Sequence, residues 1–176
     1  MFNIDIVFDD VSISSVEKED IFEIENWINS QQMFNIDAGQ NYSIKEFYER
    51  YLEYYVSEGE YFLKVLCNSE IIGIIKGRIE FKNPNEVWIM CFLIEHSLYD
   101  EVISTTVINE FLKHLYINYG IGNFYTFVSA DNHEMLKLWN HNSFELCRVT
   151  SNFLEINSED KDILILKKEF NMNKVK

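Results

Sequence analysis

The chain has 176 residues, of which 47% are hydrophobic, 15% aromatic and 25% charged. This is the mixture of an ordinary globular protein, and it excludes a disordered, collagen-like or coiled-coil chain. The length suffices for one domain with a hydrophobic core and is short for two. We therefore expect a single domain over residues 1–176.

The charge is strongly negative: 29 Asp and Glu residues face 15 Lys and Arg residues, a formal net charge of -14. Such a surface repels phosphate backbones and anionic lipids, which argues against nucleic-acid and membrane partners and favours a cationic one. No apolar run reaches the length of a membrane span, and residues 1–10 lack the basic start and cleavage site of a signal peptide. Cytoplasm is the expected location.

Cysteine and histidine usage predicts neither disulfides nor a metal site. Cys67, Cys91 and Cys147 are odd in number and lack CxxC spacing. The four histidines form no ligand pattern, so we expect no metal.

The first half of the chain begins with strand patterns and continues with two helices. Apolar residues alternate over 2–8 and again over 11–16, the period of a strand. A helix with one apolar stripe follows Asp20. A second helix is predicted after Ser43, which forms the N-cap of a capping box with Glu46.

Three strands are predicted next, over 61–67, 71–81 and 87–94, and short polar turns separate them. Connections this short imply antiparallel neighbours. Residues 87–94 contain no charge, so we expect a central strand that is covered on both faces.

The second half starts with a helix whose apolar positions run from Ile103 to Leu115 and which ends at Gly120. A strand over 124–128 follows, then a short helix that a capping box of Asp131 and Glu134 would open. Two last strands are predicted over 146–154 and 163–166. This order of elements predicts an α/β fold, a mixed sheet with helices on both faces.

The order of elements and the stretch 128–144 together resemble the GNAT superfamily of N-acetyltransferases. The late motif of that family runs roughly V-x-x-x-N-x-x-A-x-x-x-Y-x-x-x-G-F. Val128, Asn132 and Phe144 match it, whereas Met135, Trp139 and Ser143 replace its Ala, Tyr and Gly. The resemblance covers nearly the whole chain and implies a GNAT-like fold with a central, mostly antiparallel sheet.

The resemblance also implies acetyl-CoA as co-substrate. The family's signature R/Q-x-x-G-x-G/A aligns with 99–104, where Tyr99 replaces Arg or Gln, Asp100 and Val102 replace glycines, and Ser104 fits the last small position. The implied acetyl-CoA contacts are Tyr99, Val102, Ile103, Ser104 and Asn132, with the backbone of Phe92 and Ile94. Asp100 and Glu101 either stabilise the helix dipole alone or also repel the pyrophosphate. Asn132 is either a cofactor contact or a helix cap.

Two residues are candidates for the chemistry. The family's strand glutamate falls on Trp88, and Glu86 lies two residues earlier, either a base acting through water or a solvated acid at the strand start. The family's acidic Tyr falls on Trp139, which either packs in the core or lines the thiol pocket, where its N–H would stabilise the departing sulfur.

The resemblance therefore predicts an N-acetyltransferase that moves an acetyl group from acetyl-CoA to a primary amine of a small molecule or peptide. The acidity of the chain favours a cation such as a polyamine, an aminoglycoside or a basic peptide terminus, and the resemblance is compatible with a homodimer. The alternative is a GNAT-fold binding or regulatory module with impaired catalysis. The altered 99–104 loop, Trp88 and Trp139 favour that alternative.

Overall fold

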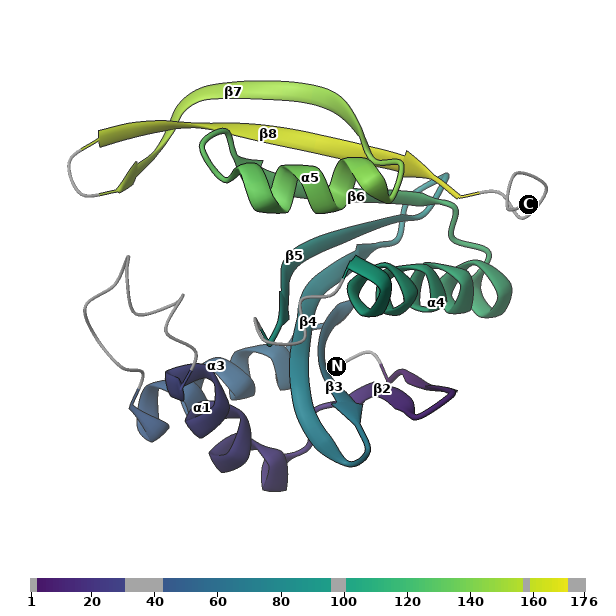
Figure 1. Cartoon of the computed structure of the whole chain (residues 1–176), viewed down its shortest axis with the longest axis vertical. Helices are drawn as coiled ribbons and strands as arrows, with labels where there is room; N and C mark the ends of the chain where they lie inside the picture. Colours follow the sequence, from purple (N-terminus) through teal and green to yellow (C-terminus); the bar gives the residue numbers. More distant parts are fainter. Residues whose placement is uncertain (1–2, 31–42, 96–100, 157–158, 171–176) are drawn as a thin grey trace. The chain divides into compact units, whose positions relative to one another are not determined.

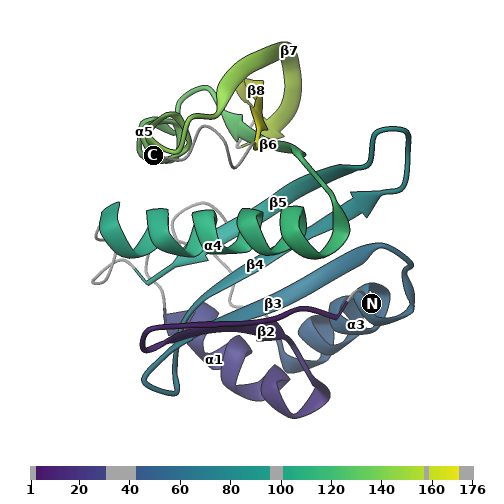
Figure 2. The same ribbon diagram turned by 90° about the vertical axis from the view of Figure 1, so that its right-hand side faces the viewer.

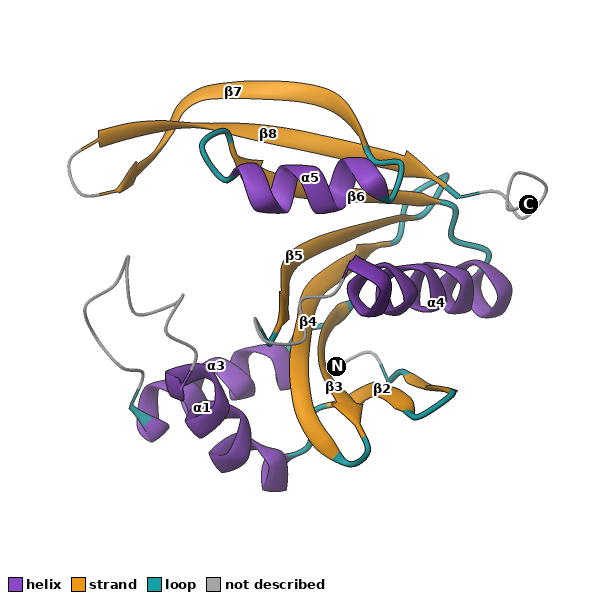
Figure 3. Cartoon of the chain, viewed as in Figure 1, coloured by secondary structure: helices purple, strands orange, loops and turns teal. Residues whose placement is uncertain are grey.

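The computed structural model describes residues 3–30, 43–95, 101–156 and 159–170. The elements, drawn in Figures 1 and 3, are β1 (Asp5–Phe8), β2 (Val11–Ser15), the 3-10 helix η1 (Lys18–Asp20), α1 (Ile21–Ser30), α3 (Ile44–Val56), β3 (Glu60–Cys67), β4 (Glu70–Glu80), β5 (Glu86–Ile94), α4 (Glu101–Tyr119), β6 (Asn123–Ser129), α5 (His133–His141), β7 (Glu145–Ile156) and β8 (Glu159–Glu169).

The strands are hydrogen bonded in the order β1-β2-β3-β4-β5-β6-β8-β7. The pairs β1–β2, β2–β3, β6–β8 and β7–β8 are antiparallel, and β5 runs parallel to β6. The predicted mixed α/β fold with a mostly antiparallel sheet is confirmed.

The chain forms two units of packed structure. The first comprises residues 1–77 and 91–99, and the second comprises residues 78–90 and 100–176. Strands β4 and β5 therefore contribute residues to both units.

The first unit is built around a cluster of buried side chains from α1, α3, β3, β4 and the connection after β2: Val16, Ile21, Ile24, Ile28, Phe47, Tyr51, Phe62, Ile71 and Ile74. Helices α1 and α3 lie side by side (Figures 1 and 2). The predicted capping box opens α3: Ser43 Oγ accepts a hydrogen bond from the Glu46 N–H at 3.3 Å, and the Glu46 carboxylate accepts one from the Ser43 N–H at 3.0 Å.

Gly73 of β4 lies against the backbone of β5. A Cβ atom at this position would collide with the Leu93 carbonyl oxygen and the Ile94 side chain. We expect Gly73→Ala to lower the free energy of unfolding by about 1–3 kcal/mol, because the two strands must move apart. Thermal unfolding followed by circular dichroism measures the effect. Gly122→Ala is the graded comparison, because its Cβ would stand 3.2 Å from the Phe170 carbonyl oxygen; a loss as large as that of Gly73→Ala would contradict the explanation.

Lys76 of β4 places its ammonium group against two aromatic rings. Its Nζ lies 5.2 Å from the ring centroid of Tyr54 and 4.9 Å from that of Phe62. Burial lowers the pKa of Lys76 and nearby Arg50 lowers it further, whereas Cys91 opposes the shift. Burial likewise raises the pKa of the Cys91 thiol. Among the described residues, no carboxylate pairs with this ammonium group.

The burial of Lys76 is expected to lower the free energy of unfolding by an amount that depends on pH. Since the folded chain disfavours the Lys76 cation, the unfolded chain binds more protons between the lowered pKa of the folded chain and the usual lysine pKa of 10.5. The free energy of unfolding therefore rises with pH in that window. Lys76→Met keeps the apolar stem, so we expect a higher unfolding midpoint than wild type at pH 7. That gap should narrow as the pH rises to about 9.5, still below the usual pKa of tyrosine. Thermal scans at several pH values test this, and a gap that stays constant or widens would contradict it.

The second unit contains α4, α5 and the β7–β8 hairpin, which lies beside β6 (Figure 1). The predicted apolar face of α4 is buried at Val107, Ile108, Phe111, Leu112 and Leu115. Helix α4 ends as predicted at Gly120, which adopts a φ of 65° and donates its N–H to the Tyr116 carbonyl at 3.0 Å. No helix in the described ranges is long and apolar enough to cross a membrane.

The prediction that β5 is covered on both faces is wrong for its first half. Val87 and Ile89 are buried, whereas Trp88 is partly exposed and Met90 is 44% exposed. The next buried positions are Phe92 and Ile94, so the alternation shifts by one residue after Ile89. The run lacks charges because its open face is apolar, not because that face is covered.

Candidate functional site

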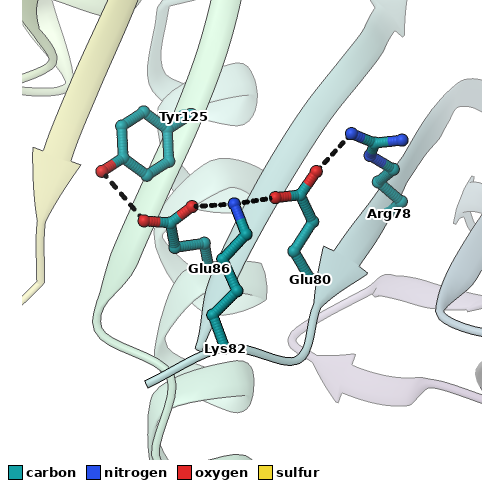
Figure 4. A network of polar contacts seen from close by, with 5 residues as sticks. All are labelled: Arg78, Glu80, Lys82, Glu86 and Tyr125. Atoms are coloured by element: carbon teal, nitrogen blue, oxygen red, sulfur yellow. Dashed lines mark hydrogen bonds and ion pairs between the residues drawn. The ribbon is translucent and has the colours of Figure 1, made fainter. Parts of the chain in front are cut away.

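Glu86 starts β5 and is held by two side chains of the second unit. The Tyr125 hydroxyl donates to Glu86 Oε1 at 3.4 Å, and Lys82 Nζ lies 3.2 Å from Glu86 Oε2 (Figure 4). Burial, aided by the Glu86 carboxylate, raises the pKa of Tyr125, so this hydroxyl keeps its proton and remains a donor. The glutamate therefore combines a fixed position with a side chain that is 21% exposed.

The contacts of Glu86 belong to a longer chain of charges. Lys82 also pairs with Glu80, and Glu80 pairs with Arg78 (Figure 4). The hydrogen bond that Lys82 donates to Glu80 lowers the pKa of Glu80 and raises the pKa of Lys82. Two cations and two carboxylates alternate along this Arg78–Glu86 network, so its formal charges cancel.

A cavity of about 360 Å³ opens on the same part of the second unit. Its lining comes from β4, β5, β6, β7 and β8: Arg78, Trp88, Met90, Phe127, Thr150, Ile163 and Ile165. The Trp88 ring stacks on Tyr125 with centroids 4.9 Å apart and planes 17° from parallel. Because Tyr125 also bonds Glu86, one aromatic pair connects the carboxylate with the cavity wall.

The sequence missed Tyr125, Lys82 and the cavity. Tyr125 stands opposite Trp88 in the parallel pairing of β5 with β6, a neighbour relation that depends on the strand register. Lys82 had a weak signal, since it precedes Glu86 by four residues across a tight turn.

Of the residues predicted to hold the cofactor pyrophosphate, Val102, Ile103 and Ser104 lie in the first turn of α4. Tyr99 and Asp100 lie outside the described residues, and α4 begins at Glu101. Val102 is 67% exposed, Ile103 is partly buried and Ser104 is fully buried. Within the described ranges, the Ser104 hydroxyl has no hydrogen-bond partner. The first-turn N–H groups of a helix are free of intrahelical acceptors, so this end of α4 offers donors that fit a pyrophosphate.

Asn132 is the N-cap of α5, where its Oδ1 accepts a hydrogen bond from the Met135 N–H at 3.1 Å. The predicted capping box of Asp131 and Glu134 is therefore wrong by one residue. The Asp131 carboxylate instead accepts a hydrogen bond from Ser129 Oγ at 2.5 Å. Asn132 is exposed and keeps its amide N–H₂ group for other contacts, so its predicted contact with acetyl-CoA stays a prediction.

Trp139 lies in the core of the second unit. It is 1% exposed, and its ring meets that of Phe144 edge to face at 4.8 Å. Phe92 and Ile94 belong to the first unit and bury their side chains, and their predicted backbone contacts with acetyl-CoA stay predictions. The structure thus brings Glu86 and Tyr125 together, and it places the α4 start, Asn132 and Trp139 in the same unit as that pair.

Among the described residues, no cluster of three or more His, Cys, Asp or Glu side chains is arranged to hold a metal ion.

Comparison with known proteins assigns the chain to a class. Residues 13–165 match the family model described as Acetyltransferase (GNAT) domain. The chain therefore belongs to the GNAT acetyltransferase family. The comparison with curated proteins gave no match.

Several solved structures share the fold. An acetyltransferase from Salmonella typhimurium that modifies the N-terminal serine of ribosomal protein L7/L12 superimposes with a TM-score of 0.82 at 13% identity, over 93% of this chain and 97% of that one. RimL, a ribosomal L7/L12 alpha-N-protein acetyltransferase in complex with coenzyme A, superimposes with a TM-score of 0.81 at 14% identity, over 93% of this chain and 96% of that one. Spermidine N-acetyltransferase from Vibrio cholerae, in complex with CoA and spermine, superimposes with a TM-score of 0.76 at 17% identity, over 91% of this chain and 95% of that one.

Proposed function

We propose that this protein transfers the acetyl group of acetyl-CoA to a primary amine. The observation that carries the proposal is the Glu86 carboxylate, fixed by Tyr125 and Lys82 two residues before the cavity-lining Trp88. An amine with a pKa near ~10.4 is mostly protonated at neutral pH, so its attack on a thioester needs a proton acceptor in reach. Membership of the GNAT family supplies the reaction type.

In the proposed reaction, the ammonium proton of the substrate passes to Glu86 through water. The amine nitrogen then bonds to the acetyl carbon, and the nitrogen gives up its second proton to solvent. The carbon–sulfur bond breaks, and CoA leaves as a thiolate that takes up a proton from solvent. A thiol pKa near ~8.5 makes thiolate a tolerable leaving group without a tyrosine acid. The Trp139 indole N–H would stabilise the sulfur only if the sulfur reaches this buried ring.

Acetyl-CoA would be held at three places. The N–H groups at the start of α4, with Val102, Ile103 and Ser104, would hold the pyrophosphate, and Tyr99 would belong to the same loop. The backbone of Phe92 and Ile94 would hold the pantetheine arm. Asn132 would add a side-chain amide. Each assignment follows the position of the residue in the family motif.

Calorimetric titration of the full chain with acetyl-CoA and with CoA tests the proposal. We expect saturable binding of both and acetylation of an amine panel, followed by mass spectrometry. Absence of heat and of a thermal shift at millimolar ligand would overturn it.

A second function is a binding or regulatory module with the GNAT fold and no catalysis. It is favoured by Trp139, which replaces the tyrosine acid of the family motif and packs in the core. Binding of CoA without acetylation of any amine would support this function over the first.

Asp100 and Glu101, which align with the family's pyrophosphate-binding signature, are expected to weaken CoA binding. Two unit charges ~4 Å apart repel by about 1 kcal/mol in water and by about 4 kcal/mol at an effective dielectric of ~20. We expect Asp100→Gly combined with Glu101→Lys to lower the Kd for CoA by about tenfold or more. The gain should shrink with added salt, which screens charges. An unchanged Kd at low salt would place the pyrophosphate elsewhere.

A further inference from the structure

The cavity differs in chemistry from the acidic surface of the chain as a whole. Five of its seven lining side chains are apolar: Trp88, Met90, Phe127, Ile163 and Ile165. Thr150 and Arg78 complete the lining, which contains no carboxylate. A polyamine that entered would lose the hydration of its charges without a carboxylate to replace it. The acidic residues behind the net charge of -14 therefore do not line this cavity.

The two carboxylates linked to the cavity lining through Arg78 and Tyr125 are engaged. Glu80 pairs with both Arg78 and Lys82, and Glu86 pairs with Lys82 and accepts the Tyr125 hydroxyl. With its formal charges cancelled, the Arg78–Glu86 network exerts little pull on a polycation. It does offer one carboxylate and one guanidinium to a ligand with a single charge of each sign.

Arg78 is the one charged residue of the lining. Its Nη2 donates to Glu80, while a guanidinium carries five N–H donors in all. Its side chain is 51% exposed, so donors remain for the carboxylate of a ligand, the group that this planar fork binds best.

The apolar wall is continuous across three strands. Phe127 of β6 stands opposite Ile165 of β8, and Ile163 of β8 stands opposite Thr150 of β7. Residues directly opposite in an antiparallel pair share one face of the sheet. Together with Trp88 they surround a volume of about 360 Å³, within the range of small-ligand pockets and ample for one aromatic ring with a short side arm.

We propose that the cavity binds the ring of a small aromatic amine that also carries a carboxylate, such as an aromatic amino acid, with the carboxylate on Arg78 and the amine toward Glu86. This assignment rests on the proposed acetyl transfer and names its acceptor class. The proposed acceptor also differs from the cationic acceptor that the overall acidity of the chain favours.

The first experiment measures binding without catalysis. We use 3-phenylpropionate, which has the ring and the carboxylate but no amine, in calorimetric titration of the full chain. Saturable 1:1 binding is expected, weakened about tenfold or more in Arg78→Gln and lost in Ile165→Asp. Val149→Asp is the matched control: it adds the same charge on β7, opposite Leu164 and on the other face of the strand, and should leave binding unchanged. Circular dichroism verifies that each variant folds.

The second experiment compares acceptors. With acetyl-CoA present, we expect a higher kcat/KM for L-phenylalanine than for spermidine. If phenylpropionate binds as expected but no amine is acetylated, acetyl transfer fails and the cavity assignment holds. Binding of phenylpropionate that is equal in wild type and Ile165→Asp, or tighter binding of spermidine than of phenylpropionate, would overturn the assignment.

Discussion

Replacing Glu86 with glutamine is expected to lower kcat/KM for acetyl transfer by about 10²- to 10⁴-fold, the usual contribution of one general base. Glutamine keeps the shape and can still accept the Tyr125 hydroxyl, but it cannot take a proton from the substrate ammonium. The loss should shrink as the pH approaches the amine pKa, near ~10.4, because the free amine then needs no acceptor. A pH profile of initial rates for both proteins measures this.

Glu80→Gln is the matched control for that change. Glu80 is the other carboxylate that pairs with Lys82, and it lies farther along the Arg78–Glu86 network. A lost surface ion pair is worth about 1 kcal/mol or less, so we expect a loss of about fivefold or less. Equal losses of kcat/KM in both variants, with parallel pH profiles, would show that Glu86 acts only through the structure of the network and not as a base.

The second large effect is expected from Trp139→Ala, which should lower the free energy of unfolding by about 3–5 kcal/mol. The ring is 1% exposed and packs edge to face on Phe144, so truncation leaves a cavity and removes an aromatic pair. Urea unfolding followed by circular dichroism measures the change. Val102→Ala, on an exposed position of α4, should alter stability by less than about 0.5 kcal/mol.

Trp139→Phe separates packing from chemistry at the same position. Phenylalanine keeps an aromatic ring in the core and removes the indole N–H. We expect kcat per folded molecule to stay near that of wild type, since the ring is buried. A large fall in kcat with a small fall in stability would instead assign the N–H a part in stabilising the departing sulfur.

Local signals accounted for the elements that the sequence predicted well. The Ser43 and Glu46 capping box, the apolar face of α4 and its end at Gly120 depend on neighbours within one or two helical turns. The start of α5 shows the limit of such signals. Asp131 and Asn132 are both good N-caps one residue apart, and only the fold selects Asn132.

The candidate site was less accessible to sequence reasoning, because its parts meet through strand register. Glu86 and Tyr125 are 39 residues apart and become neighbours when β5 pairs with β6. The charge-free run after Glu86 did not show whether the strand is covered on both faces. Large apolar residues such as Trp88 and Met90 give the same sequence pattern whether their side chains lie under a covering layer or line a cavity.

The stack of Trp88 on Tyr125 gives the cavity its own optical reporter. Indole emission depends on the polarity of its surroundings, and Trp88 is the tryptophan that lines the cavity, while Trp27 belongs to the first unit and Trp139 to the core of the second. A ligand that displaces water from the cavity would therefore shift the emission of Trp88 toward the blue. Ligands that do not absorb at the excitation wavelength can thus be ranked by fluorescence in the unlabelled protein.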